Sequence, residues 1–145
     1  GTVELQDWVG QVEGMPVVVQ FRNASTGQLI RARNAVLGAD GSFSVTTALT
    51  GTYRVAVKAP HWLRSQLTGV VIDGSGASGL EFSLLNGDCD GDNAVTVFDY
   101  AVLSDAFDSM PGDTKWDDRA DLDGDGAVTV FDYAILSDNF DQSGD

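Results

Sequence analysis

The chain of 145 residues has a single cysteine and a single histidine, and both scarcities limit its chemistry. Because Cys89 has no partner, no disulfide can form within the chain. We expect Cys89 to be a tolerated small residue that points away from any metal. The acids of residues 1–85 are scattered singly, and with His61 alone they give no serine–histidine–acid order for a catalytic triad. We therefore expect a protein that is not an enzyme.

Long apolar runs are missing as well. A membrane span needs about 20 consecutive apolar residues, and no run in this sequence approaches that length. No charged-then-apolar leader precedes the first predicted strand. The chain starts abruptly at Gly1, so we expect it to be the tail of something larger, without membrane insertion.

Basic residues are few, 8 against 22 acidic ones, and the formal net charge is −14. Residues 1–85 hold six basic and six acidic side chains, which cancel. Residues 86–145 hold two basic side chains and sixteen aspartates, and so carry the whole excess. Such an acidic segment repels nucleic acid and anionic membranes. The contrast predicts two domains, 1–85 and 86–145, with a boundary at Leu85-Asn-Gly87 so short that the two should touch.

The acidic part contains a stretch that occurs twice. Repeats 88–108 and 121–141 lie 33 residues apart and differ at only four positions. Each begins with a twelve-residue loop that has oxygen-bearing residues at positions 1, 3, 5, 7, 9 and 12, the spacing of a calcium loop. The repetition argues against an ordinary solvated acidic loop, and it predicts two calcium ions. The predicted ligands are Asp88, Asp90, Asp92, Ala94, Thr96 and Asp99, and then Asp121, Asp123, Asp125, Ala127, Thr129 and Asp132.

Two features of these loops point to a family. Position 12 is Asp rather than the Glu of an ordinary EF-hand, and no helix precedes either loop. With the linking phrase Arg119-Ala-Asp-Leu-Asp-Gly-Asp-Gly126, the segment from Gly87 to the end resembles a dockerin with two F-hand calcium loops. Dockerins attach extracellular enzymes to cohesin domains of a scaffold or cell-surface protein. The resemblance implies a secreted protein of the cellulosome type, active in polysaccharide degradation, with a cohesin as its partner.

The same resemblance implies a binding surface, because loop positions 10 and 11 and the following helical turns of dockerins contact cohesin. These positions hold Val97, Phe98, Ala101, Val102 and Asp105, and Val130, Phe131, Ala134, Ile135 and Asp138. The Val-Phe pair departs from the Ser-Thr type common in enzyme-borne dockerins and favours a more apolar, anchoring type. An alternative stays open, in which Phe98 and Phe131 pack against each other or against residues 1–85.

Helices are predicted over 97–108 and 130–140. The recurrence of Tyr100, Leu103 and Phe107 at helical spacing, matched by Tyr133, Leu136 and Phe140, predicts one buried stripe per helix. A domain of about 60 residues is marginally stable without disulfides or bound metal ions. We therefore expect calcium binding to be part of folding and chelation to unfold residues 86–145 while residues 1–85 stay folded.

Residues 1–85 show short apolar runs separated by turn signals, which predict an all-β antiparallel sandwich of about seven strands. The expected strands are 2–9, 16–23, 28–37, 42–48, 52–59, 67–73 and 79–85. The phrases Asp40-Gly-Ser-Phe-Ser-Val45 and Leu49-Thr-Gly-Thr-Tyr-Arg-Val-Ala-Val57 are similar to prealbumin-like, carboxypeptidase regulatory-like domains. Placed directly before a dockerin, such a spacer resembles an X module.

Two other functions compete with cohesin binding. Trp8 and Trp62 could stack on a pyranose ring, which would make residues 1–85 a carbohydrate-binding domain with a calcium-stabilised appendage. Alternatively, residues 86–145 could be a calcium-stabilised cap that binds no cohesin.

Overall fold

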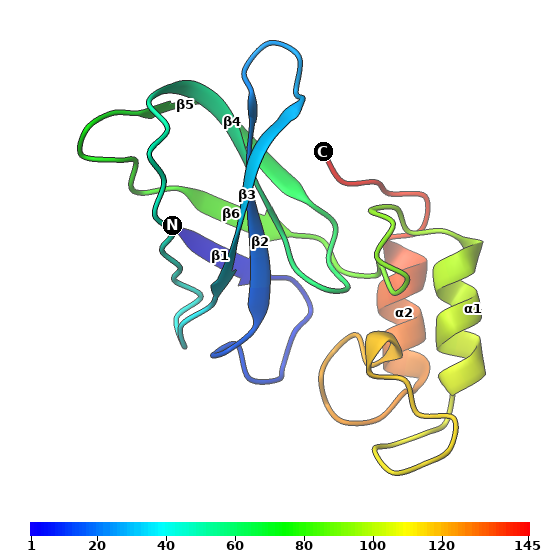
Figure 1. The fold of residues 1–145 in the computed structure, drawn as a ribbon. Coiled ribbons are helices and arrows are strands. Elements are labelled where there is room, and N and C mark those ends of the chain that lie inside the picture. The colour runs from blue at the N-terminus through cyan, green and yellow to red at the C-terminus, as the bar shows by residue number, and fades with distance from the viewer.

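The computed structural model describes all of residues 1–145 (Figure 1). A four-stranded antiparallel sheet has the strand order β3-β2-β4-β5, and a parallel pair, β1-β6, lies beside it. The strands are β1 (Thr2–Leu5), β2 (Pro16–Asn23), β3 (Leu29–Val36), β4 (Gly51–Lys58), β5 (Ser65–Ile72) and β6 (Glu81–Leu84). Two helices, α1 (Val97–Ala106) and α2 (Val130–Asp138), and the 3-10 turn η1 (Asp118–Ala120) follow.

The β-core follows from alternation along the strands. In β2, the side chains of Val17, Val19 and Phe21 are buried while those between them reach the surface. The inner side chains of the β1-β6 pair meet them from the other side, so that one apolar cluster fills the space between the two sheets. Trp62 is fully buried in the same cluster.

The helices start where the sequence provides caps. Thr96 and Thr129 are the N-caps, and each forms a capping box with the aspartate three residues later, Asp99 or Asp132. In Figure 1 the two helices lie side by side at one end of the β-structure. Between them and the loops lies a second apolar cluster that includes Leu103, Leu122 and Leu136.

The prediction of two domains, a seven-stranded antiparallel sandwich and an all-α dockerin, is wrong. The chain forms one domain, mostly β with two helices, and it has six strands. Residues 42–48 form no strand and make only an isolated bridge, Thr2 with Ser42, since Phe43 and Val45 pack onto the β-core as an irregular segment. The pairing of β1 with β6 is parallel, so the β-structure is not purely antiparallel.

Packing between the two parts explains why the chain is a single domain. Leu63, from the connection between β4 and β5, is buried in the helical cluster rather than in the β-core. The last residues run back along the β-structure, where the Asp145 N–H donates to the Arg64 carbonyl at 3.0 Å. Asn86 is fully buried at the junction. The predicted contact across Leu85-Asn-Gly87 is therefore confirmed, and its extent rules out a separate helical domain.

The predicted helical stripes are also wrong, apart from their leucines. Leu103 and Leu136 are buried, but Tyr100 and Tyr133 are 46% and 45% exposed, and their rings meet edge to face at 5.8 Å. The inward face of α1 is Asp99, Leu103 and Ala106. The helix turns this way because its first-turn aspartate is directed into the loop that precedes it. Phe107 and Phe140 consequently lie on the outer side, beyond the last helical residues.

Candidate metal centres and docking surface

The first loop brings three of its predicted ligands together. Carboxylate oxygens of Asp88, Asp90 and Asp99 all lie within 4.8 Å of one another, and Asp88 and Asp99 are fully buried. Backbone N–H groups hold Asp99 in place, since Asp90 donates to its Oδ1 at 3.1 Å and Thr96 donates to its Oδ2 at 2.7 Å.

The second loop repeats this arrangement with Asp121, Asp123 and Asp132. Leu122 donates its N–H to Asp132 Oδ1 at 2.7 Å, and Thr129 donates to Oδ2, also at 2.7 Å. Burial raises the pKa of Asp121 to about 6, against two backbone hydrogen bonds that lower it. Three carboxylates in so small a space repel one another unless a cation lies between them.

The chemistry of the donors fits a hard divalent cation. Asp88 is buried, and its Oδ1 has no hydrogen-bond partner. A buried carboxylate oxygen without a partner carries a large desolvation cost, which a metal ligated at that oxygen would remove. Oxygen donors only, presented by a twelve-residue loop, suit calcium.

The other predicted ligands are placed differently. Asp92 and Asp125 are exposed and lie outside the two clusters, and each accepts the N–H two residues later, from Ala94 and Ala127, at 2.9 Å. Thr96 and Thr129 use their hydroxyls to cap the helices. At position 6 the backbone has the positive φ that the loop requires, 74° at Asn93 and 87° at Gly126.

Contacts from residues that precede the repeats hold the second loop, and the sequence had not indicated which residues make them. The ring of Trp8 covers Gly124 so closely that an added Cβ would lie 2.5 Å from it. Val9 donates its N–H to the Asp123 carbonyl at 2.8 Å. The Asn86 side chain donates to the Leu122 carbonyl at 2.6 Å. These contacts join residues that are distant in sequence. In the sequence, only the short linker indicated that the two parts of the chain would touch.

The loop positions 10 and 11 lie at the surface. Phe98 and Phe131 are 67% and 66% exposed, and Val97 and Val130 are exposed as well. These exposures exclude the alternative in which the two phenylalanines are packed away. Of the remaining predicted contact residues, Ala101, Asp105, Ala134 and Asp138 are exposed, whereas Val102 and Ile135 are half-buried against the helical cluster.

The two phenylalanines differ in their surroundings. Phe131 and Ile135 line a surface hollow of about 490 Å³ whose other wall includes Trp8 and Val9. Phe98 lines neither this hollow nor the one beside Tyr100 and Tyr133. The β-structure therefore extends the exposed surface of α2 in a way that α1 lacks.

Other residues that the sequence singled out are structural. Trp62 is fully buried and its Nε1 donates to the Gln6 carbonyl at 3.0 Å, so it cannot stack on a sugar. His61 is stacked on Trp62 with ring centroids 3.8 Å apart, and burial lowers its pKa to about 4. Cys89 is buried in the helical cluster, which raises the pKa of its thiol. Neither of the two α-helices has the length and apolarity that crossing a membrane would require.

Comparison with known proteins agrees with this arrangement of paired acidic loops and helices. Residues 86–141 match the family model of the dockerin type I domain. Among curated proteins, no sequence matches the chain.

Two solved structures are similar over nearly the whole chain. One is an N-terminal interface mutant of a type II cohesin–X–dockerin complex from Acetivibrio cellulolyticus, with a TM-score of 0.75 and 20% identity. The other is a C-terminal interface mutant of such a complex from the same organism, with a TM-score of 0.74 and 21% identity. Each match covers 99% of this chain and 95% of the other. At these identities the similarity shows that the fold is shared.

Proposed function

We propose that the protein is a calcium-dependent anchoring module that binds a cohesin domain and attaches an extracellular protein to a scaffold or cell surface. The observation that supports this most is the pair of exposed Val-Phe dipeptides, which occupy equivalent places in the two loops, each directly before the last aspartate of an acidic cluster. Large exposed apolar side chains rimmed by charge are typical of partner surfaces. The dockerin match and the similarity to chains of cohesin–X–dockerin complexes agree with this function.

In this proposal each loop holds one calcium ion. Asp88, Asp90 and Asp99 would hold the first, with Asp92, the Ala94 carbonyl and Thr96 completing the set. The equivalent residues of the second loop, Asp121, Asp123, Asp125, Ala127, Thr129 and Asp132, would hold the second. The ions would supply positive charge where the carboxylates of each cluster converge and would fix the start of each helix. Residues 86–145 would then present the docking surface, and residues 1–85 would support it as an X module does.

The test is calorimetric titration of the full chain with type I and type II cohesins, once in calcium and once in chelator. We expect binding to at least one class of cohesin in calcium and its loss in chelator. A chain that takes up calcium but binds no cohesin of either class would instead be a calcium-stabilised cap. No structural feature favours carbohydrate binding, since Trp62, one of the two tryptophans expected to stack on a sugar ring, is buried.

A further inference from the structure

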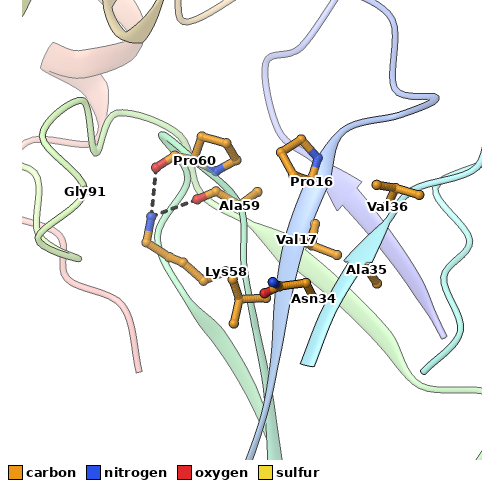
Figure 2. Close-up of a pocket in the computed structure, with 10 residues that line it drawn as sticks. Pro16, Val17, Asn34, Ala35, Val36, Lys58, Ala59, Pro60 and Gly91 are labelled. Atoms are coloured by element: carbon orange, nitrogen blue, oxygen red, sulfur yellow. Dashed lines mark hydrogen bonds between the residues drawn. The ribbon is translucent and has the colours of Figure 1, made fainter. Parts of the chain in front are cut away.

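The two acidic loops are nearly identical in sequence, but a lysine from the β-structure touches only the first. Lys58, the last residue of β4, places its Nζ 2.8 Å from Asp88 Oδ2. The same ammonium donates to the Ala59 carbonyl at 2.8 Å and to the Pro60 carbonyl at 3.0 Å. Figure 2 shows these two bonds, with Gly91 of the first loop nearby. The Lys58 side chain is only 17% exposed, so water screens its charge poorly.

The Lys58 contact leaves one oxygen of Asp88 available. Oδ2 accepts from Lys58 and from the Asn93 N–H at 3.1 Å, while Oδ1 is buried without any partner. In the second loop, backbone groups alone satisfy the equivalent carboxylate: Gly124 donates to Asp121 Oδ1 at 3.0 Å and Gly126 donates to Oδ2 at 3.1 Å. Lys58 thus sits behind the first metal ligand without occupying the oxygen that would face the ion.

A fixed cation at this place stabilises the empty loop more than the filled one. Each loop has four aspartates, so its formal charge is −4 when empty and −2 with one calcium ion. The attraction between Lys58 and the loop scales with that charge. The coupling between the Lys58 ammonium and calcium is reciprocal. Because the ammonium stabilises the empty loop more than the filled one, it lowers the affinity of the loop for calcium.

We propose that Lys58 is a built-in counter-ion that competes with calcium at loop 88–99, so that loop 121–132 fills at lower calcium concentration than loop 88–99. This inference rests on the proposed function, in which both loops bind calcium. It makes the β-structure a determinant of the calcium response of the first repeat. Val97 and Phe98 are positions 10 and 11 of the first loop, so this half of the docking surface would be completed last.

The experiment uses the full chain labelled with ¹⁵N and calcium buffered by a chelator. Asn93 and Gly126 occupy position 6 of their loops and donate to the position-1 carboxylate, so their amide signals report each loop separately. In the wild type we expect the Gly126 signal to reach its midpoint first. In Lys58→Met we expect the Asn93 midpoint to fall by about tenfold in free calcium, within the usual range for coupled sites, with the Gly126 midpoint unchanged within about twofold.

Arg54→Met is the matched control. Arg54 lies on the same strand and carries the same charge, but it donates to the Ala24 and Ser25 carbonyls at 2.9 and 3.1 Å and touches neither loop. Its replacement should shift neither midpoint. In chelator, Lys58→Met should melt at a lower temperature than the wild type, because the empty loop has lost its counter-ion. Tighter calcium binding together with a less stable empty protein distinguishes competition from ordinary structural support, whose loss would weaken both.

An Asn93 midpoint that is unchanged or higher in Lys58→Met overturns the inference. If neither amide responds to calcium in the wild type, the proposed function fails instead, so the two failures are distinguishable. Should Lys58→Met unfold in chelator, calcium release from the filled protein decides the matter. We expect slower release from the first loop of this variant, whereas Lys58→Arg, which keeps the charge, should release calcium as the wild type does. Equal release from Lys58→Met and the wild type would contradict the competition.

Discussion

Replacing Phe131 should damage partner binding far more than replacing Phe98. The two residues are equally exposed at equivalent places, but only Phe131 borders the hollow that it shares with Trp8 and Val9. A partner seated over α2 can bury Phe131 and contact the β-structure at the same time. Seated in the reverse orientation over α1, it would lose that second contact. We therefore expect the β-structure to select one of the two orientations that the repeats would otherwise offer.

The size of the effect follows from exposed area. A phenylalanine buries roughly 200 Å², and 66% of the Phe131 surface is accessible in the free protein. Covering about 130 Å² at about 25 cal/mol per Å² contributes ~3 kcal/mol, which corresponds to about a hundredfold in Kd. Val9 is 74% exposed, and covering it should contribute about 1 to 2 kcal/mol. Neither replacement should change the free energy of unfolding by more than about 0.5 kcal/mol, because both side chains already face water.

The assay is titration of a cohesin that the wild type binds with the full-length variants Phe98→Ala, Phe131→Ala and Val9→Ser. Val71→Ala, which removes a similarly exposed side chain from β5, is the control and should bind normally. Full-length variants are needed because Leu63 is buried in the helical cluster, so deleting residues 1–85 would damage that cluster. Equal losses for the two phenylalanines, with Val9→Ser silent, would refute selection by the β-structure. No loss even in the double phenylalanine variant would remove both residues from the interface.

Three further results are expected. Calorimetry of metal-free protein should find two calcium sites, and Asp99→Ala or Asp132→Ala should each remove one; a wild type with one site or none would contradict the assignment. Chelation should lower the melting temperature of a single cooperative transition of the whole chain, because Trp8, Asn86 and Lys58 tie the loops to the β-structure. Strand signal in circular dichroism that survives the loss of all helical signal would contradict a single transition. Leu103→Ala should destabilise the fold by about 2 to 5 kcal/mol, whereas Tyr100→Ala should cost less than about 1 kcal/mol, as measured by urea denaturation.

The acidic loops were predictable because their information is local. A metal loop must return its ligands to one point within twelve residues, so the spacing of Asp88, Asp90 and Asp99 is enough to bring them together. The N-caps at Thr96 and Thr129 follow from the same stretch. Six of the seven predicted strands overlap an observed strand, since alternation of apolar residues is also a local property.

The orientation of the helices was not predictable from apolar spacing alone. A stripe through Tyr100, Leu103 and Phe107 has helical periodicity, but Asp99 must point into the metal loop, and this rotates α1 so that Leu103 and Ala106 face inward. The helix could not both bury the aromatic stripe and direct Asp99 into the metal loop, and the position of Asp99 decided its orientation. The strand predicted over 42–48 failed for a different reason, since whether an extended segment pairs depends on which neighbours the fold leaves free.

The β-structure breaks the symmetry of the two repeats in two places that the sequence keeps equal. Lys58 approaches the first loop and leaves the second without a cation, while Trp8 covers Gly124 in the second loop and nothing covers Gly91, its counterpart in the first. Both contacts come from residues outside the repeats, so they are free to differ while the repeats stay alike. A symmetric pair of helices would offer a partner two equivalent binding positions. Here Lys58 contacts one loop and the Trp8 ring covers the other, so the two positions differ in both calcium response and shape. Such a difference is the condition for binding in a single orientation.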